Sequence, residues 1–453
     1  MIRAHGAGGF MKTKAVVLLV SSILAPAIYA HGQIDCTTST KLVCELPTSA
    51  AVLAASVVSQ KGQTSAAQAA AIASAQSVSR AVNSSIGTQL TQLPIPSGSV
   101  GVVSLQQKDN PLGVPYENLG PILTGRPDTV GRHRLFAGFS YQHFNFTSID
   151  GISLHSLPVG FQFSQTVQVG NQPTDTQTIT SSELNKVGFQ LDQYVGQVTY
   201  GLTSTTDVSV AIPFNDVSLS AVSSNFNAYI YDQNSSQYQN ASLPAGTQIP
   251  SSGTANGIGD VIVNVKQLLI GKEGLRPAVS AGLDIRFPTG DALNYLGSGA
   301  YGYNLHGLFE YRWKVSPHLK VGYQWNGKSE LVTSGSGSAK SASLPGGVQY
   351  DIGADYSLIR QITIAVDVLG SQFVNSPSLS ISTLPFSQPL PSSFAPLSTV
   401  VPVTTTYTTS NISGGVKYHA SRHWTLYGNV LVPLNNAGLR SNLVPLGGLS
   451  YNR

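Results

Sequence analysis

Residues 257–291 read GIGDVIVNVKQLLIGKEGLRPAVSAGLDIRFPTGD and contain two consecutive runs in which apolar and polar residues alternate. In the second run, Leu283 and Ile285 alternate with Asp284 and Arg286. Side chains of a β-strand point alternately to opposite faces, so one face of this run is apolar and the other is charged. An Arg or Lys facing mid-bilayer lipid costs roughly 2–4 kcal/mol, so a lipid-facing strand needs an uncharged face. The stretch therefore predicts membrane strands with one lipid-facing and one wet side.

The same alternation continues along the chain from residue 132. We expect strands near 133–147, 190–202, 206–216, 258–269, 277–287, 301–312, 318–327, 347–357, 361–370, 408–419, 424–433 and 442–452. Every second connection is short, at 203–205, 270–276, 313–317, 358–360 and 420–423. The intervening connections are longer and are expected to be loops, at 148–189, 217–257, 288–300, 328–346, 371–407 and 434–441. Short turns at one rim and long loops at the other are typical of membrane barrels, so the pattern predicts an all-β, transmembrane antiparallel β-barrel of about 12 strands.

The composition agrees with this fold class and excludes others. Only 10% of the residues are charged, against roughly 25% in ordinary soluble domains. A mean hydropathy of +0.06 and the lack of a long uninterrupted apolar run argue against a helical membrane protein. The net charge of +4 comes without a cluster of Lys or Arg, so nucleic-acid binding has no support. Composition alone leaves a soluble β-sandwich or a secreted adhesin open.

The first 131 residues differ from the rest of the chain. Residues 1–30 contain a basic start, an apolar run and small residues before Ala30, which predicts a cleaved export signal peptide. Cys36 and Cys44 follow, and two cysteines in an exported chain predict one disulfide loop. Ser65–Ser85 is rich in alanine and predicts a helix that continues weakly to Leu93. We interpret residues 31–131 as a partly helical extension in the periplasm or as a plug in the barrel, which itself spans 132–453.

Two motifs carry a resemblance to a known family. Gly257-Ile258-Gly259-Asp260 opens one expected strand, and Phe287-Pro288-Thr289-Gly290-Asp291 closes the next. In this order the motifs resemble the outer-membrane barrel family named for the meta-pathway of phenol degradation, over residues 132–453. The resemblance implies an outer-membrane transporter or channel, with uptake of hydrophobic or aromatic compounds. Residues 442–452 also resemble the C-terminal assembly signal of outer-membrane proteins, although the chain ends Tyr451-Asn452-Arg453 rather than on an aromatic residue.

The charged residues on the wet faces are the candidate functional residues. We expect the following to project into the lumen: Asp260, Lys266, Asp284, Arg286, His306, Glu310, Arg312, Lys320, Asp351, Asp355 and Lys417. They would form a mixed-charge constriction that selects a solute, or they would pair across the wall and stiffen it. Girdles of Tyr and Trp are expected at the strand ends.

The resulting functional hypothesis is passive passage of small molecules, including hydrophobic or aromatic ones, across the bacterial outer membrane. The alternative is a structural or adhesive barrel that acts through its long loops. The nine histidines lie in no nucleophile motif and no metal-ligand spacing is present, so we expect neither an enzyme nor a cofactor. Expected partners are outer-membrane lipid, the barrel assembly machinery and a small-molecule solute, and no nucleic acid.

Overall fold

The computed structural model describes residues 36, 39–46, 48, 52, 55, 72–73, 81–83, 85–90, 93, 119–167, 175–271, 277–331, 342–359, 361–421 and 423–452. The predicted signal peptide lies outside these residues. Residues 34–453 form one compact unit, to which the following description applies. Among the described residues, no helix is long and apolar enough to cross a membrane.

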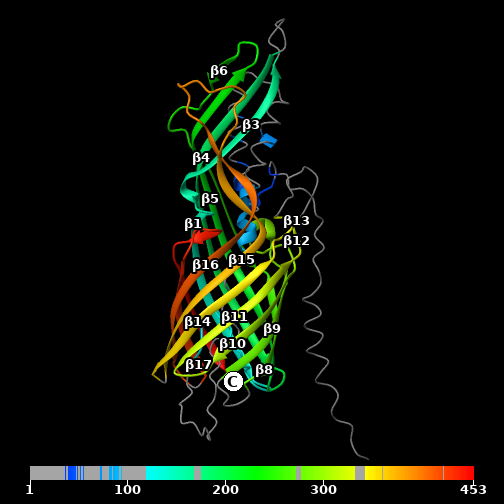
Figure 1. Cartoon of the computed structure of the whole chain (residues 1–453), viewed down its shortest axis with the longest axis vertical. Coiled ribbons are helices and arrows are strands. Elements are labelled where there is room, and N and C mark those ends of the chain that lie inside the picture. Colours follow the sequence, from blue (N-terminus) through cyan, green and yellow to red (C-terminus); the bar gives the residue numbers. More distant parts are fainter. Residues whose placement is uncertain are drawn as a thin grey trace, which may run out of the picture. The chain divides into compact units, whose positions relative to one another are not determined.

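Twelve antiparallel strands form a closed barrel (Figure 1). In order around the wall they are β1 (Leu135–Ile149), β4 (Asp175–Gly201), β5 (Thr206–Asp232), β8 (Val261–Ile270), β9 (Pro277–Phe287), β10 (Gly302–Tyr311), β11 (Val315–Asn326), β14 (Gly347–Ile359), β15 (Ile362–Thr383), β16 (Ser398–His419), β17 (Trp424–Pro433) and β19 (Val444–Asn452). Each pairs with the next, and β19 pairs with β1 in the register Phe136↔Asn452 to Gln142↔Leu446. This pairing closes the wall, and the predicted fold class is confirmed.

Shorter elements accompany these twelve strands. They are β2 (Ile152–Ser153), β3 (Leu157–Val167), β6 (Gln237–Asn240), β7 (Ile249–Ile258), β12 (Lys328–Ser329), β13 (Ala342–Ser343), β18 (Leu439–Ser441) and the 3-10 turns η1 (Leu42–Cys44), η2 (Leu154–Ser156) and η3 (Ala292–Asn294). The predicted short connections join strand ends at one rim, which we call the short-turn end. His423 Nδ1 lies 2.8 Å from the Asn452 carbonyl there, so the C-terminal strand also ends at this rim.

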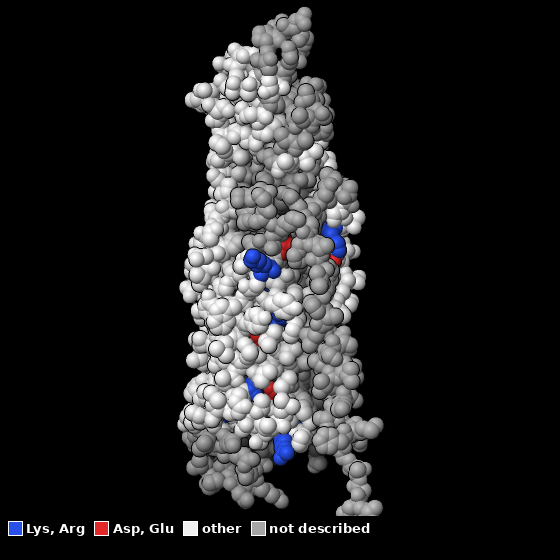
Figure 2. All heavy atoms as spheres, turned by 90° about the vertical axis from the view of Figure 1, so that its right-hand side faces the viewer, with Lys and Arg blue, Asp and Glu red and all other residues white. Residues whose placement is uncertain are grey.

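The predicted faces of the strands are confirmed. On β10, Tyr303, Leu305 and Phe309 are exposed, whereas Asn304 and His306 are buried. None of the positions assigned to the lipid face on β5, β8–β11, β14 and β15 is buried. Figure 2 shows that charged side chains are sparse on the face of the wall that carries β8 and β9. The outer surface therefore has the uncharged character that lipid contact requires.

The apolar belt has a clear outer limit. On β4 the belt includes Tyr200, Val198 and Tyr194, and the next outward residue is Asp192. Asp192 is the register partner of both His143 and Asp216, so a polar ring begins at one level on three strands. Eight residues at about 3.3 Å each, on a strand tilted by about 40°, cover about 20 Å, close to the roughly 25 Å belt of outer-membrane barrels.

Several strands continue far beyond this belt, which corrects the prediction of loops at 148–189, 217–257 and 371–407. β4 and β5 pair continuously from Gly201↔Asp207 to Gln177↔Asp232, apart from one bulge near residue 183. β3, β4, β5, β6, β15 and β16 extend past the barrel in Figure 1. Outside lipid the outward face no longer needs apolar residues, so Ser, Thr and Asn replace them and the lipid pattern disappears. The buried face still alternates, because these strands enclose a core.

Several of the described N-terminal residues lie in that core. Leu42, Val82 and Ile86 are almost fully buried and share one apolar cluster with inward side chains of the wall, such as Phe146 and Phe189. Cys36 and Cys44 form the predicted disulfide. Residues 72–73, 81–83 and 85–90 are helical, within the stretch where a helix was predicted.

A candidate solute chamber in the barrel lumen

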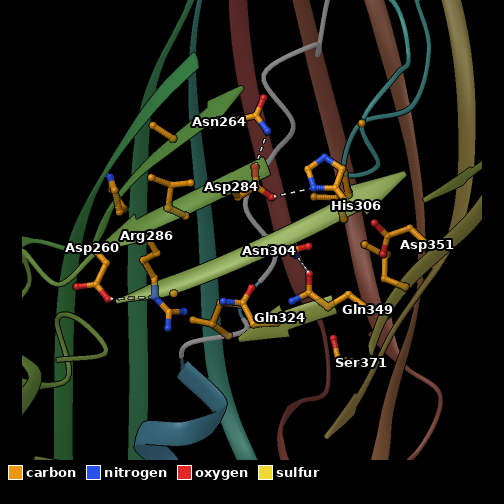
Figure 3. Close-up of a pocket in the computed structure, with 18 of the residues that line it drawn as sticks. Asp260, Asn264, Asp284, Arg286, Asn304, His306, Gln324, Gln349, Asp351 and Ser371 are labelled. Atoms are coloured by element: carbon orange, nitrogen blue, oxygen red, sulfur yellow. Dashed lines mark hydrogen bonds and ion pairs between the residues drawn. The ribbon is translucent and has the colours of Figure 1, made fainter. Parts of the chain in front are cut away.

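The lumen contains a chamber of about 300 Å³ at the level of the apolar belt. Gln193, Gln197 and Thr199 of β4 line it, and they alternate with the outward belt residues Tyr194 and Val198. One side of the chamber is a polar wall made by β9, β10, β11 and β14 (Figure 3). The inward side chains of this wall are Asp284, Arg286, Asn304, His306, Lys320, Gln324, Gln349 and Asp351. The chamber is therefore enclosed by the strands that carry the apolar belt and is strongly polar on one side.

Small residues make room for the larger polar ones. Gly282 is the register partner of His306, and a Cβ at Gly282 would lie 2.4 Å from His306 Nε2. A Cβ at Gly322 would similarly lie 2.6 Å from Asn304 Oδ1. Any larger residue at these two inward positions would displace the neighbouring side chain, so the glycines allow His306 and Asn304 to lie across the adjacent strands.

The ionisable side chains of the polar wall lie in pairs. His306 Nδ1 lies 3.3 Å from Asp284 Oδ2, and Asn264 donates a 2.6 Å hydrogen bond to Asp284 Oδ1. Lys320 Nζ lies 4.0 Å from Asp351 Oδ2. Figure 3 shows His306 and Asn264 pointing towards Asp284. Because both signs alternate around the chamber, the described residues that line it form no ring of a single charge.

The two sequence motifs meet at one edge of the chamber. The Gly290 and Ser298 amides donate to the Asp260 carboxylate at 3.1 and 2.7 Å, and Arg286 Nε lies 3.7 Å from Asp260 Oδ2. Thr289 Oγ1 donates to the Gly259 carbonyl at 2.6 Å. Two hydrogen bonds of the Asp260 carboxylate thus come from backbone amides that follow β9. These contacts hold the strand ends in place at the edge of the chamber.

A second group of charges holds residues 119–131, which we call the lumen strap. Arg126 Nη2 lies 2.9 Å from Glu310 Oε1 and 3.3 Å from Asp128 Oδ2, and Asp128 also pairs with Arg312. The Arg126 and Glu310 side chains are 1% and 0% exposed. Burial alone would lower the pKa of the Arg126 guanidinium, but the charges of Glu310 and Asp128 raise that pKa above its ordinary value. The guanidinium is therefore charged while it is buried.

Hydrogen bonds to backbone atoms fasten both ends of the strap. Lys417 Nζ donates to the Leu119 carbonyl at 2.8 Å, and Lys266 Nζ donates to the Arg126 carbonyl at 3.0 Å. The Leu119 amide donates to Thr363 Oγ1 at 3.1 Å, and the Val130 amide donates to Asp207 Oδ2 at 2.9 Å. These wall residues lie near the short-turn ends of β5, β8, β15 and β16, so the strap lies across this end of the lumen.

Other N-terminal residues lie on the opposite side of the chamber. Leu90 and Leu93 line it, whereas Leu123 and Arg126 line it from the strap. Asn83 donates to the Val43 carbonyl, and Gln89 donates to the Tyr407 hydroxyl of β16. Lys41 Nζ lies 2.6 Å from Asp291 Oδ2, just beyond β9. The chamber thus has N-terminal residues at both of its ends.

All eleven candidate residues have inward positions, but they divide into two groups. Those at the chamber are Asp260, Asp284, Arg286, His306, Lys320 and Asp351. Those at the short-turn end are Lys266, Glu310, Arg312, Asp355 and Lys417, of which Lys266 also borders the chamber. Asp355 lies 3.4 Å from His318, whose other ring nitrogen lies 2.5 Å from Asp367 Oδ1.

Arg126 and Asp128, which lie at the centre of the second group, were not among the residues predicted from the sequence. They lie in a Pro- and Gly-rich stretch with no alternation, and nothing in their spacing reveals their wall partners. Asn304 and Gln349 were also missed, because uncharged inward residues are common on every strand. A wet-face position on β10 and β14 is the only signal that could have found them.

A closed barrel of twelve strands with an uncharged belt and a polar lumen defines a barrel of the outer-membrane type. Residues 161–379 match the family whose description reads Putative MetA-pathway of phenol degradation, which is the family that the two motifs resemble. No match to the chain was found among the curated proteins.

Solved structures with a similar fold are outer-membrane barrels. An outer-membrane channel from Pseudomonas putida F1 is 12% identical, with 74% of this chain and 100% of that chain covered and a TM-score of 0.43. The TodX deltaS2S3 mutant monoaromatic hydrocarbon channel is 10% identical, with 72% and 92% covered and a TM-score of 0.33. A FadL homologue from Pseudomonas aeruginosa is 6% identical, with 72% and 91% covered and a TM-score of 0.27. Among the described residues, no cluster of His, Cys, Asp and Glu could hold a metal ion.

Proposed function

We propose that this protein is a gated outer-membrane transporter that passes small molecules through its lumen. In this proposal, residues 31–131 are a plug rather than a periplasmic extension. The observation that carries the proposal is the chamber of about 300 Å³ at membrane level, which has N-terminal residues at both ends. Its volume is about twice that of the roughly 150 Å³ cavity that binds benzene, so it is large enough for a small organic solute.

The strap acts as the gate at the short-turn end. Its contacts hold the lumen closed at rest: the Arg126–Glu310 ion pair and the Lys417 side chain are fully buried, and separating a buried pair leaves each charge without its partner. They are also reversible, because each is an ion pair or a hydrogen bond that water could replace when the strap leaves the wall. A rigid structural barrel would gain more from an apolar filling, since buried ion pairs are seldom more stabilising than well-packed apolar residues.

A bridge between strap and wall tests this proposal. The Leu119 amide lies 3.1 Å from Thr363 Oγ1, so Leu119→Cys combined with Thr363→Cys places two thiols across the contact. We expect liposomes with the wild-type protein to take up small solutes, and the bridged variant to lose uptake until a reductant is added. Wild-type liposomes with the same reductant control for the Cys36–Cys44 disulfide. Undiminished uptake through the bridged variant, or no uptake by the folded wild type, would refute the proposal.

A further inference from the structure

The polar wall of the chamber contains an open hydrogen-bond acceptor and a loosely spaced ion pair. Asn304 is 4% exposed, and its Oδ1 accepts no hydrogen bond from the described residues. Asp351 is 9% exposed, and in the described part of the chain its nearest cation is Lys320 Nζ, 4.0 Å away. That distance is too long for a direct hydrogen bond. Figure 3 shows Asn304 and Asp351 on neighbouring parts of the same wall.

Asn304, Lys320 and Asp351 together offer both donors and acceptors. The Lys320 ammonium can only donate, whereas the Asp351 carboxylate and Asn304 Oδ1 can only accept. A hydroxyl group both donates and accepts, so a solute with two hydroxyls can complement Lys320 and Asp351 together. A pure hydrocarbon offers no hydrogen bond to any of these three groups, so it would replace the water around them without compensation.

Charged solutes fit less well than neutral ones. An anion attracted by Lys320 would also lie near Asp351 and Asp284, and a cation attracted by those carboxylates would meet Lys320 and Arg286. All four residues line the chamber. The balance of signs therefore gives an ion little net attraction to offset the water that it loses on entry.

The N-terminal residues add apolar side chains to the chamber. Leu90, Leu93 and Leu123 line it together with the polar wall. A solute with a compact apolar body and hydroxyl groups fits this mixed lining. From these features we propose that the chamber recognises small neutral compounds with at least two hydroxyl groups, through Asn304, Lys320 and Asp351. This inference rests on the proposed function and names the class of its substrate.

A set of probes that share one ring tests the inference on the full-length protein folded in detergent. The probes are 1,4-cyclohexanediol, cyclohexane carboxylate, cyclohexylammonium and cyclohexane, and binding is measured by calorimetry. We expect the diol to bind at least tenfold more tightly than the other three. Tighter or equal binding of either ion or of cyclohexane would overturn the proposed class.

Variants of the wall link the binding to these residues. Lys320→Met combined with Asp351→Leu should weaken diol binding at least tenfold and reduce the preference over cyclohexane. Asn304→Asp, which keeps the size of the side chain, should weaken the diol and strengthen cyclohexylammonium, and it gives a second test if the double variant does not fold. Lys186→Met is the matched control, since Lys186 is exposed on β4 beyond the belt. Unchanged diol affinity in both wall variants would refute the assignment.

The binding test and the uptake test can refute the substrate class and the transporter independently of each other. Diol binding without uptake through the wild-type barrel would refute the transporter and leave a binding chamber of the proposed specificity. Uptake of all four probes at similar rates, with no preferential binding, would leave the transporter and refute the substrate class.

Discussion

Glu310→Ala tests the gate at its most buried contact. The substitution leaves Arg126, whose side chain is 1% exposed, without its 2.9 Å partner. Removing one member of a buried ion pair costs about 3–5 kcal/mol, and we take about 3 kcal/mol because Asp128 stays 3.3 Å from Arg126. Since about 1.4 kcal/mol is a factor of ten, the closed strap should open about 10²-fold more often.

Hydrogen exchange of the strap amides measures this opening. The Leu119 and Val130 amides are bonded to Thr363 and Asp207 of the wall, so they exchange only when the strap leaves it. We expect both amides to exchange about 10²-fold faster in Glu310→Ala, while the paired amides of β10 keep their wild-type rates. Lys41→Ala is the control, because the Lys41–Asp291 pair is 38% and 35% exposed and a pair of this kind contributes only about 0.2–1 kcal/mol.

Two results would refute this reasoning. Strap amides that exchange at the same rate in Glu310→Ala and in the wild type would show that the ion pair does not hold the strap. Faster exchange throughout the barrel would show that Glu310 stabilises the wall as a whole instead.

Three further predictions concern other contacts. Lys417→Met should accelerate hydrogen exchange at the Leu119 amide and leave exchange at the Val130 amide unchanged. The reason is that Lys417 donates hydrogen bonds only to the first part of the strap, at the carbonyls of Leu119 and Pro121. Equal acceleration at both amides would contradict this prediction. Leu305→Arg places a charge on the exposed belt and should lower the free energy of unfolding from liposomes by roughly 2–4 kcal/mol, and no change in urea titration would argue against lipid contact. Gly282→Leu should displace His306 and destabilise the barrel by about 1–3 kcal/mol. Gly307→Ala is the control and should have almost no effect, because nothing lies within 4 Å of the added Cβ. Equal stability of the two variants would contradict the packing described for His306.

The barrel was predictable because lipid imposes a local rule. Each lipid-facing position must be apolar whatever its neighbours are, so residues such as Leu283 and Ile285 reveal both the strand and its outward face. The extensions of β4, β5, β15 and β16 were mistaken for loops because that rule ends at the polar ring of His143, Asp192 and Asp216. Beyond this ring, only packing against the core determines the conformation of the strands. That packing depends on residues that are distant in the sequence.

The candidate site was predictable in part for the same reason. Inward charges such as Asp284 and Glu310 follow directly from alternation, but their roles depend on what enters the lumen. Glu310 and Lys417 hold the strap. Glu310 is 184 positions from Arg126 along the chain, and Lys417 is 298 positions from Leu119. No local pattern in residues 119–131 encodes those partners.

Single-channel recording of the full chain tests the proposed gate most directly, with the wild type and Glu310→Ala compared in the same planar bilayers. We expect the wild type to be closed for most of the recording and Glu310→Ala to open about 10²-fold more often at the same conductance. A wild type that is steadily open, or equal open fractions in the two proteins, would contradict a lumen that is closed by the strap.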